Sequence, residues 1–326
     1  MKFTQKLNII FSLVAKRIMK VKAPLLVSWS LTNRCNYRCQ YCGIWKKNSK
    51  ELNTSEVFFV IDELYRCGNK AIAFTGGESL MREDIIDIID YCSYRGIYTK
   101  LSTNGSLVKD KIDGLRKIGF VRMSFDGPKE VHDAQRQNGS YDEVVAAVDL
   151  LRKNNIKVGL NCVISKLNVG HINDILNEAK KIDLRISFQP LEYRNNREFL
   201  FENMPSNEEY KKVFEMLLAE KRRGNRYIAN SPMVLNYMLN GFRQGSIKCW
   251  AGLLIWRITP EGEIMACDRL EGSTESYSCL DGEIDKALNM MGPVYCSKMC
   301  LRNYTIELNY LLSFKPSTIL NLRYDF

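Results

Sequence analysis

Short apolar runs alternate with helix-like stretches over the first two thirds of the chain. Parallel strands linked by helices are expected from such an alternation, with right-handed crossovers. We therefore predict an α/β fold whose functional groups gather at the C-terminal ends of the strands. The six expected strands are Leu25–Leu31, Ala71–Phe74, Tyr98–Ser102, Val121–Phe125, Val158–Ile164 and Leu184–Phe188.

The helices between and after these strands carry clear end signals. The first is expected to begin at Asn53 or Thr54 and to stop at Gly68, as N-cap and C-terminal glycine preferences indicate. Residues 191–248 read as a helical linker, in which Ser206 caps one helix and Ser231 begins another.

The first 24 residues predict a basic amphipathic helix. The chain has 326 residues, 45% hydrophobic, and a net charge of +10, and residues 1–50 hold eleven Lys or Arg and no Asp or Glu. Such local charge favours packing across the bottom of the predicted α/β fold or docking on an anionic membrane surface or a partner, and we expect no nucleic-acid partner. Without a run of about 20 apolar residues, we expect a cytoplasmic protein, with peripheral membrane contact as an alternative.

Three cysteines within eight residues, Cys35, Cys39 and Cys42, form the densest chemical motif. Disulfides fit this spacing badly, and a structural zinc site wants a fourth ligand that is not nearby. A [4Fe–4S] cube held by three thiolates leaves one iron open for a ligand. The odd total of eleven cysteines also suits metal ligation in a reducing compartment better than pairing.

This CxxxCxxC pattern, with the aromatic Tyr41 before its last cysteine, resembles the signature of the radical S-adenosylmethionine (SAM) superfamily. The resemblance implies a partial (β/α)6 TIM-type barrel and a [4Fe–4S] cluster whose open iron binds SAM. It also implies an electron donor such as flavodoxin or ferredoxin. SAM would be cleaved to a 5′-deoxyadenosyl radical, which abstracts hydrogen from an unactivated C–H bond.

Further motifs at the strand ends resemble SAM contacts of this superfamily. Gly76, Gly77 and Glu78 resemble the GGE motif that holds the SAM amino group, with glycines that let backbone approach a ligand. Ser102 and Asn104 follow the third strand and could bind the ribose or the methionine carboxylate. An ordinary Asn-Gly turn is the alternative for Asn104.

The fourth strand ends in an SxDG motif, followed by an HDxxR motif, a combination found in many superfamily members with auxiliary clusters. The resemblance implies that Ser124 faces SAM and that Arg136 pairs with its carboxylate. Members usually have Gly after this Arg, whereas this chain has Gln137. Asn161 on the fifth strand is a further candidate for contact with the adenosine.

A second cysteine set resembles the SPASM and twitch extensions, which hold auxiliary iron–sulfur clusters. Cys249 and Cys267 enclose Gly262 at the expected spacing, in a stretch that reads as a hairpin. We expect one auxiliary [4Fe–4S] cluster, with zinc as the alternative. Its expected ligands are Cys249, Cys267, Cys296 and Cys300, and Cys279 is a spare that could replace Cys296 or Cys300.

The sequence thus predicts four segments: an N-terminal helix (1–24), a barrel (25–190), a helical linker (191–248) and a small auxiliary-cluster domain with its tail (249–326). The expected function is a radical SAM oxidoreductase for dehydrogenation or C–C or C–S bond formation, with an auxiliary cluster taking up an electron. A small-molecule or lipid-like substrate is favoured because only about 24 residues precede the first strand, too few for a leader-binding domain. Two alternatives stay open: a peptide maturase with a separate recognition protein, and an iron–sulfur or zinc scaffold.

Overall fold

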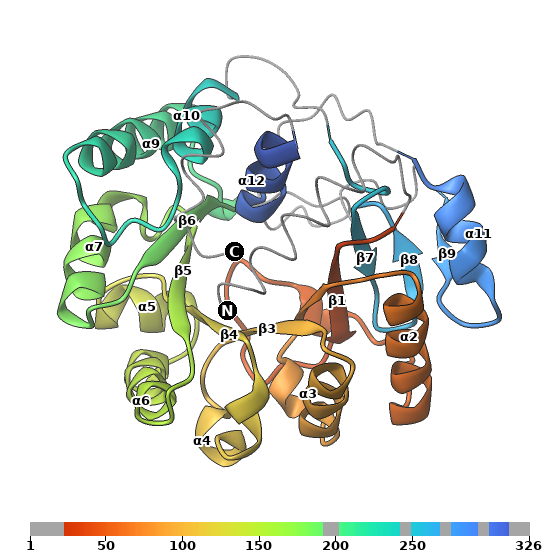
Figure 1. Cartoon of the computed structure of the whole chain (residues 1–326). Coiled ribbons are helices and arrows are strands. Elements are labelled where there is room, and N and C mark those ends of the chain that lie inside the picture. Colours follow the sequence, from red (N-terminus) through yellow and green to blue (C-terminus); the bar gives the residue numbers. More distant parts are fainter. Residues whose placement is uncertain (1–22, 192–201, 242–248, 268–274, 293–299, 313–326) are drawn as a thin grey trace.

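The computed structural model describes residues 23–191, 202–241, 249–267, 275–292 and 300–312. One sheet runs through the described chain in the order β6-β5-β4-β3-β2-β1-β7-β8-β9 (Figure 1). Its strands are β1 (Leu26–Thr32), β2 (Ala71–Gly76), β3 (Tyr98–Thr103), β4 (Phe120–Ser124), β5 (Val158–Ile164), β6 (Ile186–Pro190), β7 (Ile255–Ile258), β8 (Glu263–Met265) and β9 (Tyr277–Ser278).

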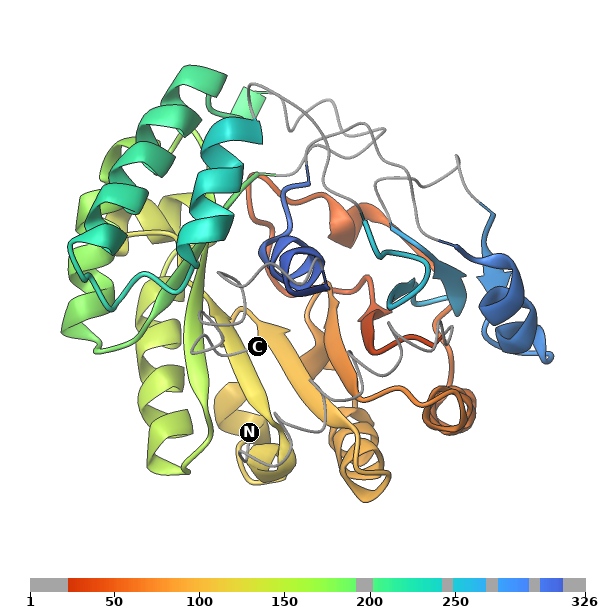
Figure 2. The ribbon, with the colours of Figure 1, turned by 45° about the horizontal axis from the view of Figure 1, so that its top comes forward.

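Strands β1 to β6 are all parallel to their neighbours, and each lies within two residues of its expected position. Helices connect them and cover the outer side of the curved sheet (Figures 1 and 2). The expected partial (β/α)6 barrel is therefore confirmed. The helices of this part are α2 (Thr54–Arg66), α3 (Ile85–Tyr94), α4 (Val108–Lys111), α5 (Lys129–Gln135), α6 (Ser140–Lys153) and α7 (Ile172–Lys181).

The hydrophobic core lies between the sheet and these helices. Alternate strand residues such as Trp29, Phe74, Leu101 and Val121 point outward and are almost completely buried under the helices. The residues between them point to the inner face of the barrel, where Ser, Thr and Asn are common. The sheet therefore presents an apolar face to the helices and a polar face to the interior.

The helix boundaries follow the expected capping chemistry. Asn53 caps α2 through a reciprocal capping box with Glu56, and Gly68 follows the helix with a φ of 79°. Ser206 forms the same arrangement with Glu209 at the start of α9 (Asn207–Arg222). Both expected N-caps are confirmed.

The predicted hairpin near the C-terminus is β7 with β8, and its first strand extends the barrel sheet. β7 pairs with β1 in parallel, and β8 then runs antiparallel to β7. Trp256 and Ile258 of β7 join the main core, which explains why this strand lies against β1. The remaining helices are α10 (Pro232–Gly241), α11 (Glu283–Met290) and α12 (Asn303–Leu312).

Some predictions fall on residues that the structure does not describe. These are the N-terminal helix up to residue 22, the ligand Cys296 and the tail after residue 312. Within the described ranges, no helix has both the length and the apolar character that crossing a membrane requires.

Candidate functional site

The cysteine loop follows β1 and holds three free, half-buried thiols, those of Cys35, Cys39 and Cys42. Among the residues that the structure describes, no three His, Cys, Asp or Glu side chains meet where a single metal ion could bind. A [4Fe–4S] cluster does not need three side chains to meet at one point, because each cysteine that holds it binds a different iron. Three neighbouring thiols on one loop are therefore compatible with a cube.

The protonation of these thiols depends on burial. Burial raises the pKa of the Cys35 thiol, and it raises the pKa of Cys39 to about 11. Arg136 partly opposes the effect of burial on Cys39, and both thiols are neutral at physiological pH unless a further positive charge is nearby. Bound iron would supply that charge and favour the thiolates, so the donor set fits an iron–sulfur cluster.

The two glycines at the end of β2, Gly76 and Gly77, support the start of the cysteine loop. Gly77 N–H donates to Thr32 O at 2.8 Å, and Glu78 N–H donates to Arg34 O at 2.8 Å. A Cβ added at Gly77 would lie 2.0 Å from Arg34 O, and one at Gly76 would lie 2.2 Å from Thr32 O. We expected the glycines to leave space for a ligand. In the structure, the backbone of the cysteine loop fills the space beside them. Their contact with SAM stays a prediction.

Glu78 is a buried carboxylate close to Cys35, whose pKa it helps to raise. It accepts hydrogen bonds from Leu80 N–H (3.1 Å), the Thr103 hydroxyl (3.0 Å) and Asn104 N–H (2.8 Å). Burial nevertheless raises the pKa of Glu78, and it forms no ion pair in the described structure. A cationic amino group next to Glu78 would stabilise the charge, so its predicted role toward SAM fits the site.

Asn104 uses its side chain within the protein. Its Oδ1 accepts from Ser106 N–H (3.0 Å) and from the Ser106 hydroxyl (2.7 Å), as in an Asx turn. Its Nδ2 donates to Asn36 Oδ1 at 3.0 Å, which ties the cysteine loop to the end of β3. These contacts correspond to the turn alternative, and contact with SAM stays a prediction.

Arg136 belongs to a buried polar group around the second cysteine. Its Nε donates to Asp126 Oδ2 at 2.6 Å, and an Nη1–H group faces Cys39 Sγ at 3.9 Å. Tyr41 completes the group, because it donates to Asp126 Oδ2 at 3.0 Å and accepts from Arg136. The guanidinium therefore faces a cysteine sulfur and Asp126, and its predicted pairing with the SAM carboxylate remains a prediction.

His132 has a structural position beside this group. Its Nδ1 accepts from Asp126 N–H at 3.0 Å, and burial lowers the pKa of His132 to about 4. The ring is thus neutral at physiological pH and fixes the turn after β4.

The other expected SAM contacts lie on the inner face of the barrel. Ser102 is on β3 and Ser124 is on β4, where it pairs in register with Asn161 of β5. Asn161 Oδ1 accepts a hydrogen bond from Ser187 of β6 at 2.8 Å. The structure brings Ser124 and Asn161 together at one end of the inner face, which suits binding of a polar ligand there.

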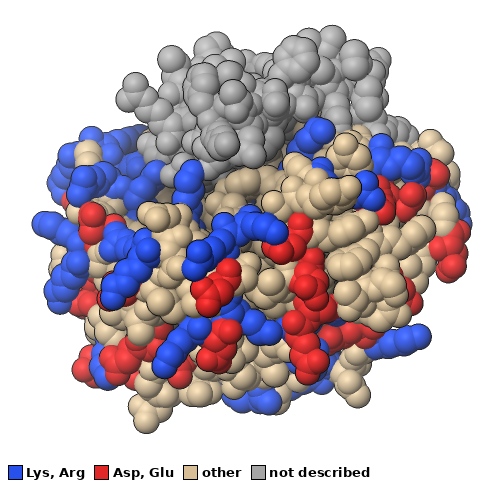
Figure 3. Space-filling view, turned by 60° about the horizontal axis from the view of Figure 1, so that its bottom comes forward, with Lys and Arg blue, Asp and Glu red and all other residues tan. Residues whose placement is uncertain are grey.

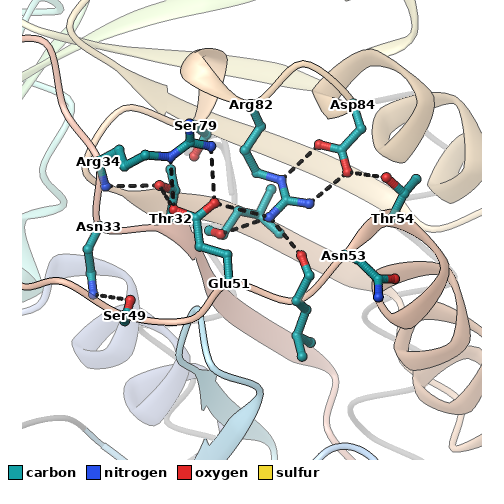
Figure 4. Close-up of polar contacts among 12 residues, drawn as sticks. Thr32, Asn33, Arg34, Ser49, Glu51, Asn53, Thr54, Ser79, Arg82 and Asp84 are labelled. Carbon is teal, nitrogen blue, oxygen red and sulfur yellow. Dashed lines mark hydrogen bonds and ion pairs between the residues drawn. The ribbon is translucent and has the colours of Figure 1, made fainter.

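A buried arginine that sequence analysis missed fastens both ends of the cysteine loop (Figure 4). Arg82 Nη1 donates to Leu31 O before the loop (3.3 Å) and to Leu52 O after it (3.0 Å). Its Nε and Nη2 pair with both oxygens of Asp84, at 2.8 and 2.6 Å. Only 6% of the Arg82 side chain is exposed.

Glu51 adds a second connection between the loop ends (Figure 4). Its carboxylate accepts from the Thr32 hydroxyl, from Arg34 Nε (3.0 Å) and Nη2 (3.1 Å), and from Arg82 Nη1 (3.5 Å). Asp84 in turn accepts from Thr54 at the start of α2, at 2.7 Å. No sequence spacing predicts this network, because its members are neighbours only after β1, β2 and α2 have packed.

Three members of the second cysteine set lie within the described residues. Cys249, Cys267 and Cys300 are half-buried free thiols, and Cys296 lies outside the described residues. A Cβ added at Gly252 would lie 2.4 Å from Gly292 O and 3.3 Å from the Ala266 side chain, so residues 252, 266 and 292 lie side by side. The assignment of these four cysteines as ligands stays a prediction.

The leftover Cys279 has a different environment. It is fully buried in the core, and burial raises its pKa to about 12. Its backbone N–H donates to Gly262 O at 2.8 Å, and its Sγ would lie 2.8 Å from a Cβ at Gly262. In the structure Cys279 is a packing residue under the hairpin.

Comparison with known proteins agrees with this geometry. Residues 29–179 match the model of the Radical SAM superfamily. The chain is 33% identical over 213 residues to the Fe-coproporphyrin III synthase of Methanosarcina barkeri, with 63% of this chain and 53% of the relative covered. It is 27% identical over 255 residues to the mycofactocin maturase MftC of Mycolicibacterium smegmatis, with 75% and 64% covered.

A solved structure has the same fold. Native anSMEcpe with bound AdoMet and Kp18Cys peptide aligns with a TM-score of 0.65 at 20% identity, over 82% of this chain and 81% of that one. Residues 29–179 are thus a radical SAM domain. This superfamily uses a [4Fe–4S] cluster and SAM, and its SPASM-type members carry auxiliary clusters, which confirms the expected cofactors as a class. The chain spans 53% and 64% of the two curated relatives.

We expect Gly77→Ala to displace the cysteine loop, because the added Cβ meets the Arg34 carbonyl. The variant should retain less iron after anaerobic reconstitution and have a lower unfolding midpoint. Gly170→Ala is the matched control, because a Cβ at Gly170 has no neighbour within 4 Å. Iron content and calorimetry measure both effects, and unchanged iron in Gly77→Ala would contradict the close packing.

We expect Arg82→Met to destabilise the protein by about 3 kcal/mol, because it removes the cation paired with the half-buried Asp84 and the donor to the Leu31 and Leu52 carbonyls. Arg82→Lys should recover part of that loss. Arg116→Met is the control, because the Arg116–Asp113 pair is exposed and should contribute less than about 1 kcal/mol. Denaturant unfolding measures the difference, and equal losses for the Arg82→Met and Arg116→Met variants would exclude a fastening role for Arg82.

Proposed function

We propose that this radical SAM enzyme oxidises a small organic molecule at an unactivated C–H bond. The observation that carries the proposal is the position of Glu78, a buried carboxylate without an ion-pair partner in the described structure, beside Cys35 of the three-cysteine loop. An ammonium-bearing ligand held there would be next to the open iron of a cube bound by Cys35, Cys39 and Cys42. When bound, the cluster and SAM supply a radical that takes one hydrogen atom from the substrate, and an auxiliary cluster accepts one electron, so that a proton is released.

The residues of the chain would orient and shield this chemistry. Glu78 would hold the amino group of SAM, and the hydroxyl and amide groups of Ser124 and Asn161 would bind the adenosine portion. Arg136 would donate an N–H to the Cys39 sulfur, which stabilises a more negative, reduced cluster. An external one-electron donor such as flavodoxin or ferredoxin is required for each turnover.

Two substrate classes are supported by the relatives. The names Fe-coproporphyrin III synthase and GTP 3′,8-cyclase, the latter 35% identical over 176 residues, denote activities on small molecules. The peptide bound in the anSMEcpe structure supports the second candidate, a peptide-modifying enzyme that works with a separate recognition protein. We favour the small-molecule class, and we retain a lipid-like molecule within it because the sequence predicts a basic amphipathic helix over the first 24 residues.

The anaerobically reconstituted and reduced protein should cleave SAM to 5′-deoxyadenosine. Changing Cys35, Cys39 or Cys42 to Ala should abolish this product, because each thiolate holds one iron of the cluster. Cys67→Ala is the control, because Cys67 lies at the end of α2 outside the loop. Chromatography of the product gives the answer, and equal yields from the loop variants and the control would refute the proposal.

The auxiliary cluster has a separate test. The double variant Cys249→Ala, Cys267→Ala should lose about four irons per chain while the first cluster remains, since each cube contains four irons. We expect uncoupled SAM cleavage to persist and substrate oxidation to fail. Iron analysis with electron paramagnetic resonance distinguishes the two clusters, and an unchanged iron content would show that these cysteines are not cluster ligands.

A further inference from the structure

The charged side chains on strands β1 to β7 are all cations, and they all point to the same face of the sheet. Strands β1 to β7 contain no Asp or Glu, and their only charged residues are Lys100, Arg122 and Arg257. The strand register places Lys100 beside Ala73, Arg122 beside Ser102, and Arg257 beside Ser28. All three therefore project from the inner face of the barrel, opposite the helix-covered core.

On the outer surface, in contrast, cationic and anionic side chains are mixed. On the face in Figure 3, Lys and Arg side chains lie among Asp and Glu side chains. Surface pairs such as Lys117 with Asp90 (2.8 Å) and Arg116 with Asp113 (3.0 Å) show this matching at the level of single contacts. The inner face of strands β1 to β7 carries cationic side chains, and none of these strands carries a carboxylate.

Arg122 is a partly buried cation on this inner face that has no acceptor among the described residues. It is half-buried, and its guanidinium makes neither a hydrogen bond nor an ion pair with the residues that the structure describes. Burial lowers the pKa of Arg122, and the phenol of Tyr304 on α12 partly opposes this effect. A guanidinium has five N–H donors in a fixed fork, so a desolvated one without an acceptor is unfavourable unless an anion binds it.

The position of Arg122 connects it to the active site. It lies two residues before Ser124 on β4, on the same inner face, which corresponds to a distance of about 7 Å along the strand. Its register partner Ser102 is another expected SAM contact. α12 lies over this space between the β6 and β7 sides of the sheet (Figures 1 and 2), where Asn303 donates to Phe188 O at 2.9 Å.

We propose that Arg122 binds an anionic group of the substrate, a carboxylate or a phosphate, on the inner face of the barrel. This inference rests on the proposed function and specifies its substrate class. A planar guanidinium can bind either anion through two parallel N–H···O contacts. Binding there would fix the substrate beside Ser102 and one layer beneath Ser124, next to the residues expected to hold SAM, which orients a C–H bond toward the site.

The test uses residue-specific modification of the full, reconstituted protein. Phenylglyoxal reacts with accessible arginines, and mass spectrometry of peptides gives the modification rate at Arg122 separately. We expect inorganic pyrophosphate or succinate to slow the reaction at Arg122 by at least about threefold relative to sodium chloride of equal ionic strength, because a paired guanidinium is blocked. Arg116, which is exposed on the outer surface, should show no such difference.

The pattern of protection decides among the outcomes. Protection by pyrophosphate alone indicates a phosphate, protection by succinate alone indicates a carboxylate, and protection by both supports a general anion site. An Arg122 that never reacts, or that reacts equally in all three solutions, overturns the inference.

Assaying SAM cleavage on the same preparation separates this inference from the proposed function. If SAM is cleaved but the anions do not protect Arg122, only the anion site is refuted. Protection without cleavage refutes the radical SAM function proposed for this chain.

Discussion

The contact between two backbones, at the end of β2 and at the start of the cysteine loop, is the constraint on which the site depends. Gly77 and Glu78 donate their N–H groups to the carbonyls of Thr32 and Arg34, at distances that leave no space for a side chain at Gly77. Because the loop is fixed there, the Glu78 carboxylate comes to lie beside Cys35. One short contact thus positions both a thiol expected to bind the cluster and the carboxylate expected to hold SAM.

The opposite side of the loop is fixed by charge instead of by close packing. Arg82 joins the carbonyl before the loop to the carbonyl after it, and Glu51 accepts from residues at the loop start. Burying such charges is unfavourable unless every donor and acceptor is used, and here the guanidinium uses several directions. Its energetic role is therefore to select one geometry of the loop, which a catalytic cluster site needs.

Local patterns in the sequence predicted much of the fold and part of the site. Strand positions followed from alternating burial, and the Asn53 cap followed from side-chain chemistry within three residues. The cysteine and GGE motifs were recognisable because their chemistry is contiguous in the chain. The Arg82 network, the Tyr41–Asp126–Arg136 group and the pairing of β7 with β1 were not predictable, because each depends on tertiary contacts between distant segments. The inward direction of Arg122 could have been inferred from strand alternation, since charged residues are rare in these strands.

The most direct measurement of the central claim is electron–nuclear double resonance on the reduced protein with SAM that carries nitrogen-15 in its amino group. If Cys35, Cys39 and Cys42 hold a cube with one open iron and Glu78 orients the amino group, a nitrogen-15 coupling to the cluster is expected. A reduced [4Fe–4S] signal that shows no such coupling in the presence of excess SAM would contradict the account.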